Sequence, residues 1–104
     1  MRRGEVWWAN LPPPAGRRPV LLLSRDLAYR VRTSVTVAAI TRTIRDIPAE
    51  VRLGLADGMP AACVINADDI LTVPKALLQD RIIVLSPEKI AAVASAIGFA
   101  LDLP

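Results

Sequence analysis

The chain has 104 residues, 53% of them hydrophobic, and this length fits one domain, which we place at residues 1–104. No apolar run approaches the about 20 residues of a membrane-spanning helix, and the first residues lack the apolar core of a signal peptide, so we expect a cytoplasmic protein without a membrane partner. The net charge is only +3, but residues 1–52 carry ten arginines against four acids, and this asymmetry favours a face that attracts a polyanion.

The first half of the chain predicts three strands. Residues 4–11 form a strand candidate that ends before three prolines, and residues 11–17 are expected to be an extended loop because proline lacks the N–H donor. Residues 19–24 are continuously apolar, which indicates a strand in the middle of the sheet. Residues 25–33 indicate a loop with one helical turn, and the β-branched residues 34–43 predict a further strand.

The second half begins with a short alternating segment at residues 49–54. Its pattern places Val51 and Leu53 inward and Glu50 and Arg52 outward. A turn is expected at residues 56–61, from Asp-Gly and proline. Three further strands are predicted at residues 62–66, 69–74 and 81–86, with a break at residues 67–68. Cys63, the only cysteine, lies in the first of them and is expected to be buried, which leaves no internal disulfide.

One helix is predicted at the C-terminal end. Ser86 is a good N-cap, Pro87 suits the first helical position, and Glu88 complements the helix dipole. The apolar residues follow helical spacing and predict one buried stripe, made of Ile90, Val93, Ala94, Ile97 and Leu101. We therefore expect a mainly β protein with a C-terminal α-helix, in which the helix covers the open side of a small barrel-like or strongly bent antiparallel sheet.

Five blocks of the sequence together carry a family resemblance. In order they are "RGEVWWANLPP", "RRPVLLLSRD", "TVAAITRT", "VINADDILTVPKALLQDRI" and "LSPEKIAAVASAIGFALDL". They resemble the successive blocks of the MazF/PemK-type toxins of bacterial toxin–antitoxin systems, from Arg3 to Leu103. No single block is specific, but five in the correct order are.

The resemblance implies an SH3-like barrel that forms a homodimer and cleaves single-stranded RNA at short sequences without a metal or other cofactor. It also implies an antitoxin partner that wraps the dimer and occupies the RNA groove. In this family an arginine in the "RPV" block and a threonine that closes the "xxIT" strand carry catalysis. Those positions are Arg18 and Thr41 here.

One feature departs from the family. A Gly-x-Glu stretch commonly precedes the "RPV" arginine, and its glutamate is often placed in the active site. This chain has only "PPPAGR" there, and no acid lies between Glu5 and Arg18. The general base is therefore unassigned, with Glu5, Asp69 and water as candidates.

The residues themselves limit the chemistry to positioned electrostatics. The chain has no histidine, and the adjacent Asp68 and Asp69 would point to opposite faces of a strand, so no metal cage is evident. The guanidinium of Arg18 can bind phosphate oxygens with two parallel hydrogen bonds, which strengthen as charge develops. Pro19 favours extended backbone at Arg18 and so fixes its direction. Thr41 can donate to the phosphate or accept from the 2′-hydroxyl.

Other polar residues are candidates for RNA contact: Arg17, Arg25, Arg42, Thr43, Arg45, Asn66 and Asp69. Taken singly, the arginines and Thr43 are better explained as solvated surface residues, and Asn66 and Asp69 are equally explained by turn or capping roles. Trp7 and Trp8 should face opposite sides of their strand, one in the core and one outward, where it could stack a base or contact a second copy. The high apolar content favours a two-fold homodimer.

Two other functions remain open on the sequence. Gyrase-poisoning toxins share the same barrel and have no nuclease site, and the missing glutamate is compatible with that function. A barrel that binds nucleic acid without cutting it would use the same arginines for phosphates alone, with steep salt dependence.

Overall fold

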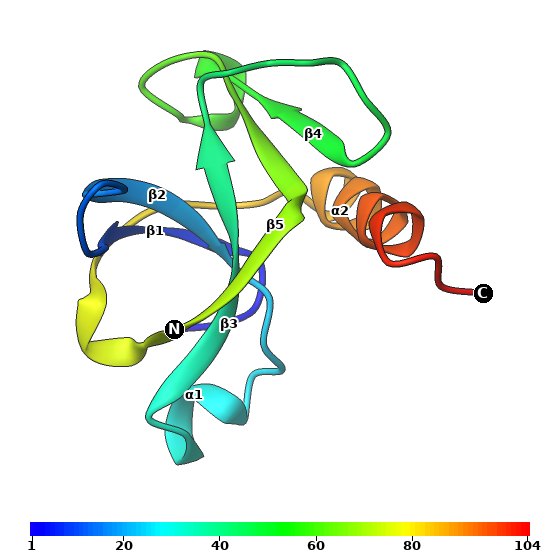
Figure 1. Ribbon diagram of the computed structural model, residues 1–104. Helices are drawn as coiled ribbons and strands as arrows, with labels where there is room; N and C mark the ends of the chain where they lie inside the picture. Colours follow the sequence, from blue (N-terminus) through cyan, green and yellow to red (C-terminus); the bar gives the residue numbers. More distant parts are fainter.

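Six strands pair into one antiparallel sheet in the order β4-β5-β3-β2-β1-β6 in the computed structural model, which describes residues 1–104 (Figure 1). The sheet curls into a half-barrel, and the C-terminal helix packs beside β4 and β5. The mainly β class with a C-terminal helix is confirmed. The strands are β1 (Glu5–Asn10), β2 (Arg17–Leu22), β3 (Ser34–Thr41), β4 (Glu50–Leu53), β5 (Cys63–Pro74) and β6 (Leu78–Val84). The helices are α1 (Ala28–Val31) and α2 (Pro87–Ala100), with short 3-10 turns η1 (Leu55–Asp57) and η2 (Lys75–Leu77).

The strand β2 lies inside the sheet, between β1 and β3, as its continuous apolar run predicts. Its successive side chains enter two different apolar clusters, because the sheet is buried on both faces here. Leu21 packs into the cluster that α2 covers, whereas Val20 and Leu22 pack into the cluster with Tyr29 of α1. A strand buried on both faces needs no polar alternation, which explains the sequence pattern.

The predicted break at residues 67–68 is wrong, because β5 is one continuous strand of 12 residues. Asn66 pairs with Ala39 and Ile70 pairs with Ala38, so three residues between them have no counterpart on β3. This is a bulge, and bulges bend a strand and redirect its side chains. Residues 64–66, before the bulge, pair with both β4 and β3, and residues 67 and 68, where a break is predicted, lie in the bulge.

The loop between β1 and β2 is a turn rather than the expected extended segment. The N–H groups of Ala15 and Gly16 donate to the carbonyl of Pro12, and Leu11 N donates to the Gly16 carbonyl. Gly16 has a φ of +67°, in the region that favours glycine. Proline fixes φ at a value that suits turns as well as extended chain, so the three prolines did not exclude this geometry.

Helix α2 begins as predicted, with Ser86 Oγ accepting a hydrogen bond from Lys89 N. The predicted buried stripe is partly wrong. Val93 and Ala96 are buried, whereas three of the expected stripe residues, Ile90, Ala94 and Leu101, are exposed. Periodicity locates the buried stripe of a helix but not its width, and α2 makes most of its contacts with β4 and β5. Its outer face stays apolar, with Phe99, Leu101 and Leu103 more than half exposed.

The other elements lie close to their predicted places. A single helical turn, α1, follows β2, and β6 begins at Leu78, three residues before the predicted start. In β4, Val51 and Leu53 are buried as expected. Neither helix has the length and apolar character that crossing a membrane requires.

Candidate catalytic and nucleic-acid-binding site

Arg18 and Thr41 face the same side of the sheet. Val20 of β2 pairs directly with Ala39 of β3, where the pairing of these strands ends, and extending this register by two residues sets Arg18 toward Thr41. Side chains two residues apart share a face, so the two candidate residues lie together. Both line one hollow of about 430 Å³ at the rim of the sheet, where β2 begins and β3 ends.

The Arg18 side chain is exposed and held at one point. Its Nε donates to the carbonyl of Ala15 at 3.0 Å, inside the β1–β2 turn. No carboxylate forms an ion pair with it, and its terminal nitrogens have no partner within the chain. The terminal nitrogens of the Arg18 guanidinium therefore remain free to bind a phosphate.

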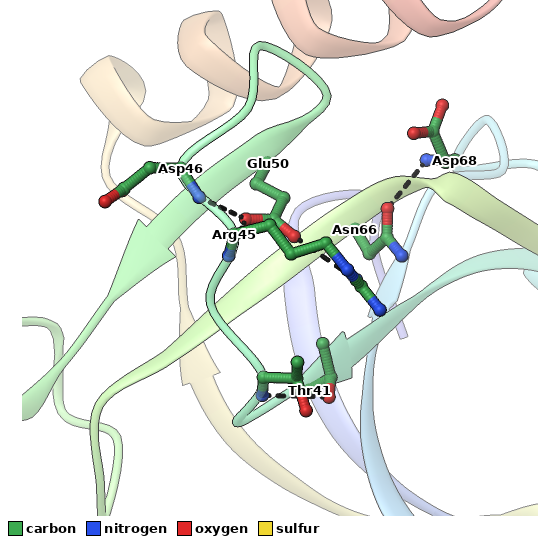
Figure 2. A network of polar contacts seen from close by, with 7 residues as sticks. Thr41, Arg45, Asp46, Glu50, Asn66 and Asp68 are labelled. Carbon is green, nitrogen blue, oxygen red and sulfur yellow. Dashed lines mark hydrogen bonds and ion pairs between the residues drawn. The ribbon is translucent and has the colours of Figure 1, made fainter.

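The hydroxyl of Thr41 is oriented by the residues that follow it. Its Oγ accepts a hydrogen bond from the Thr43 backbone N–H at 3.2 Å (Figure 2). With one lone pair occupied by that donor, the hydroxyl proton is directed elsewhere and can be donated to a phosphate oxygen. A threonine hydroxyl held this way is a hydrogen-bond donor to substrate rather than a base.

A stacked pair forms one wall of the hollow. The guanidinium carbon of Arg17 lies 4.3 Å from the centre of the Trp8 ring, and Arg17 Nε donates to Gln79 Oε1 at 3.4 Å. Both side chains are thereby fixed in position. The predicted alternation of the tryptophans is also found: Trp7 packs against the core and donates its indole N–H to Glu5, and Trp8 lies at the hollow.

The floor of the hollow is apolar. Ile40, Met59 and Cys63 are buried there, next to Pro60 and Ala61 from the segment after η1. Burial raises the pKa of the Cys63 thiol, and nearby Asp57 adds to the rise, against a smaller opposing effect of Arg42. The thiol is therefore protonated near neutral pH and is a packing group, as the sequence predicts.

The structure gathers some of the candidate RNA-binding residues and separates others. Arg17, Arg42 and Thr43 line the hollow with the two catalytic candidates. Arg25 does not, because it follows the opposite end of β2. Asn66 and Asp69 also lie outside the lining, at the start of the β5 bulge and within it, and Asn66 Oδ1 accepts a hydrogen bond from Asp68 N as a turn residue does (Figure 2).

No aspartate or glutamate lines the hollow. Glu5 lies at the other end of β1 from Arg18, where it accepts hydrogen bonds from the Trp7 indole, the Arg2 backbone N–H and Arg81. Burial is the largest single influence on its pKa and raises it, but these hydrogen bonds and the N-terminal charge together outweigh burial and lower the pKa. No three side chains of metal-binding type lie close enough to hold a metal ion.

Glu50 is the clearest difference from the sequence prediction at this site. It was expected to point outward, yet its side chain is only 1% exposed. It lies on the face that carries Ala39 and Asn66, since the three residues are aligned across β4, β5 and β3. The alternation placed Glu50 on the correct face, but the loop of residues 42–49 folds over that face and covers it.

Sequence reasoning missed the segment after η1 that forms the floor of the hollow. Met59, Pro60 and Ala61 lie far along the chain from Arg18 and were expected only as a turn. It also missed the stacking of Arg17 on Trp8. The signal for that pair was available, because strand pairing sets Trp8 opposite Pro19 and so makes Arg17 its diagonal neighbour on one face.

Comparison with known proteins gives one consistent result. Residues 2–101 match the model of the PemK-like, MazF-like toxins of type II toxin–antitoxin systems. The probable endoribonuclease MazF2 of Mycobacterium tuberculosis is 42% identical over 91 residues, covering 86% of this chain and 87% of that protein. Endoribonuclease EndoA of Bacillus subtilis is 32% identical over 111 aligned positions, covering 99% and 96%.

Solved structures agree with the sequence comparison. The Mycobacterium tuberculosis toxin MazF-mt6 superposes with a TM-score of 0.88 at 35% identity, covering 96% of this chain and 98% of that chain. A mycobacterial endoribonuclease in complex with its cognate antitoxin superposes with a TM-score of 0.87 at 31% identity, covering 100% and 97%.

Proposed function

The chain belongs to the PemK-like, MazF-like toxin family of type II toxin–antitoxin systems and is an endoribonuclease toxin, and on this premise we propose how its residues cut RNA. The substrate is single-stranded RNA, and the 2′-hydroxyl attacks the adjacent phosphorus. The bond to the 5′ oxygen breaks and this departing oxygen takes up a proton from water, which leaves a 2′,3′-cyclic phosphate on one product and a 5′-hydroxyl on the other. No metal takes part in these steps.

Arg18 and Thr41 are the catalytic residues of this proposal. The free edge of the Arg18 fork binds the scissile phosphate and stabilises the charge that develops on it, and the Thr41 hydroxyl donates to the same group. The observation that carries the proposal is their shared hollow, in which Arg18 has no carboxylate partner. Arg17, Arg42 and Thr43 bind neighbouring phosphates or bases.

The proton of the 2′-hydroxyl passes to water. Glu5 is bound at the far end of β1, and Asp69 lies in the β5 bulge outside the hollow. With neither acid at the reacting atoms, water is the remaining candidate of the three. This chain accordingly relies on charge stabilisation more than on proton abstraction.

We further place the protein in the cytoplasm as a homodimer that a cognate antitoxin neutralises. A related endoribonuclease is described in complex with its antitoxin. The exposed apolar residues at the end of α2 provide surface for a second copy, and the arginine-rich rim favours an acidic antitoxin segment. Sedimentation as a monomer at micromolar concentration would contradict the dimer.

The test is cleavage of single-stranded RNA in EDTA, with analysis of the ends produced. We expect 2′,3′-cyclic phosphate ends from the wild type, near-complete loss of cutting in Arg18→Ala, and a large loss in Thr41→Val. Arg25→Ala is the matched control, because this arginine lies away from the hollow, and it should cut normally. Full activity of Arg18→Ala, or 3′-hydroxyl ends, would refute the mechanism. Inhibition of gyrase or salt-sensitive binding without any cleavage would favour the two alternative functions.

A further inference from the structure

The loop of residues 42–49 follows Thr41 directly and carries Arg42 and Thr43, which line the hollow, and Arg45, which lies outside the lining. It has almost no backbone pairing of its own. From residue 42 to residue 47 no backbone N–H donates to a backbone carbonyl. Three of these groups donate to side-chain oxygens instead: Thr43 N to Thr41, and Arg45 N and Asp46 N to Glu50. The side chains of Thr41 and Glu50 therefore hold the backbone of this loop in place.

Glu50 makes two of these three contacts with the loop. Its Oε1 accepts Arg45 N at 2.8 Å and Asp46 N at 3.1 Å, which holds the loop at its middle (Figure 2). Asp46 has a φ of +56°, so the chain turns sharply at this point. A carboxylate that accepts two adjacent N–H groups at such a turn replaces the missing backbone hydrogen bonds.

The second oxygen of Glu50 is buried and has no hydrogen-bond partner. The group that faces it is the Arg45 guanidinium, whose Nη1 lies 3.6 Å away, and Figure 2 shows the two side chains pointing toward each other. The same carboxylate thus holds the backbone of Arg45 and orients its charge. The Arg45 side chain remains 55% exposed, so it is still accessible to RNA.

We propose that Glu50 is a positioning residue for RNA binding, which acts by fixing the Arg45 guanidinium on the loop that follows Thr41, so that it binds an RNA phosphate beyond the hollow. The buried Oε2 of Glu50 makes no hydrogen bond, and orientation of the Arg45 guanidinium gives that oxygen a role. The inference rests on the proposed function, since it assumes that RNA crosses the hollow.

Three substitutions separate the roles of Glu50. Glu50→Ala removes both contacts, whereas Glu50→Gln keeps an oxygen for the two N–H groups and loses the attraction for Arg45. Arg45→Ala removes the side chain that Glu50 positions. The matched control is Arg52→Ala, because Arg52 is bound to Asp46 of the same loop at 2.7 Å but lies on its exposed side.

The first measurement is the separation of KM from kcat in RNA cleavage. We expect KM to rise about tenfold in Glu50→Ala and in Arg45→Ala, the size of one lost hydrogen bond to a charged group, with kcat nearly unchanged. The KM of Glu50→Gln should lie between those of the alanine variants and the wild type, and the KM of Arg52→Ala should equal that of the wild type. The double variant Glu50→Ala/Arg45→Ala should be no worse than Arg45→Ala, because one residue acts through the other.

The second measurement is the salt dependence of binding to single-stranded 2′-O-methyl RNA, which cannot be cut through its 2′ position. Loss of one phosphate contact should lower the slope of log affinity against log salt by about 0.7 in Glu50→Ala and Arg45→Ala, and by a smaller amount in Glu50→Gln. This readout stays informative if the wild type proves not to cleave RNA, which would refute only the proposed function. A wild-type slope in a folded Glu50→Ala, or in Glu50→Gln if the alanine variant does not fold, would overturn the role of Glu50, as would additive losses in the double variant.

Discussion

The charged residues at the two ends of strand β1 lie in opposite environments. At its start, Glu5 is buried, and both carboxylate oxygens accept hydrogen bonds, from the Trp7 indole, Arg2 N and Arg81. At its end, β1 pairs with Arg17 and Arg18, which are exposed and have no carboxylate partner. Each of these arginines makes a single hydrogen bond, to a neutral oxygen.

The difference shows which charges hold the fold together and which are left for a ligand. A buried charge is tolerated only when its hydrogen-bonding capacity is met, so Glu5 contributes to stability. An exposed arginine with a free donor edge contributes little to stability and much to phosphate binding. Substitutions at the two ends should therefore have separate effects.

The largest expected effect is on catalysis at the arginine end. Arg18→Ala should lower the cleavage rate about 10²–10³-fold, the loss typical of one donor to a developing charge. Its free energy of unfolding should change by less than about 0.5 kcal/mol, because the side chain is exposed. Cleavage assays and urea unfolding of the same preparation measure both. A strongly destabilised Arg18→Ala variant would contradict the expectation that Arg18 contributes little to stability.

The next effect is on stability at the Glu5 end. Glu5→Ala leaves the indole N–H, the Arg2 N–H and Arg81 without their acceptor, so we expect a loss of about 2–3 kcal/mol in the free energy of unfolding. The folded fraction should keep its cleavage rate. Urea denaturation with an activity assay on folded protein checks this, and unchanged stability would contradict the structural role.

Acid titration tests the contribution of Glu5 to stability directly. Because the pKa of Glu5 is lowered in the folded state, Glu5 stabilises the fold above its unfolded pKa, near 4.5, and this contribution is lost as the pH falls through the lower folded value. The free energy of unfolding should therefore decrease below about pH 4.5 in the wild type. Glu5→Gln should show a shallower decrease, and an equally steep one would exclude Glu5 as its source.

The smallest effect at neutral pH concerns Tyr29, which is buried without the partners that Glu5 has. Its hydroxyl makes no hydrogen bond of good geometry, and burial raises its pKa to about 12 against a smaller opposing effect of nearby Ser24. Its stabilising contribution is complete below pH 10 and is lost as the pH rises through about 12. Tyr29→Phe should change stability by less than about 0.5 kcal/mol at pH 7 and weaken the alkaline decrease, as followed by thermal unfolding. A marked loss of stability in Tyr29→Phe at pH 7 would show that the hydroxyl makes a stabilising hydrogen bond.

The sequence predicted most elements because local patterns dominate them. Ser86 and Pro87 specify the start of α2, and the apolar run after Pro19 specifies an inner strand. The errors arose where distant contacts decide the outcome. The bulge in β5 depends on the register with β3, and the width of the buried stripe on α2 depends on how much of the helix the sheet covers.

For the site, Arg18 and Thr41 could be selected from the sequence through the family resemblance, and the antiparallel register brings them together. The sequence alone determined the strands, the helix start and the arginine-rich first half, because these follow from residue type and short-range spacing. Only the tertiary structure decided that Glu50 is covered, that Arg25 and Asp69 lie away from the hollow, and that Met59 forms its floor. Those outcomes depend on how loops fold over the sheet, and no local pattern encodes contacts between residues so far apart in the chain.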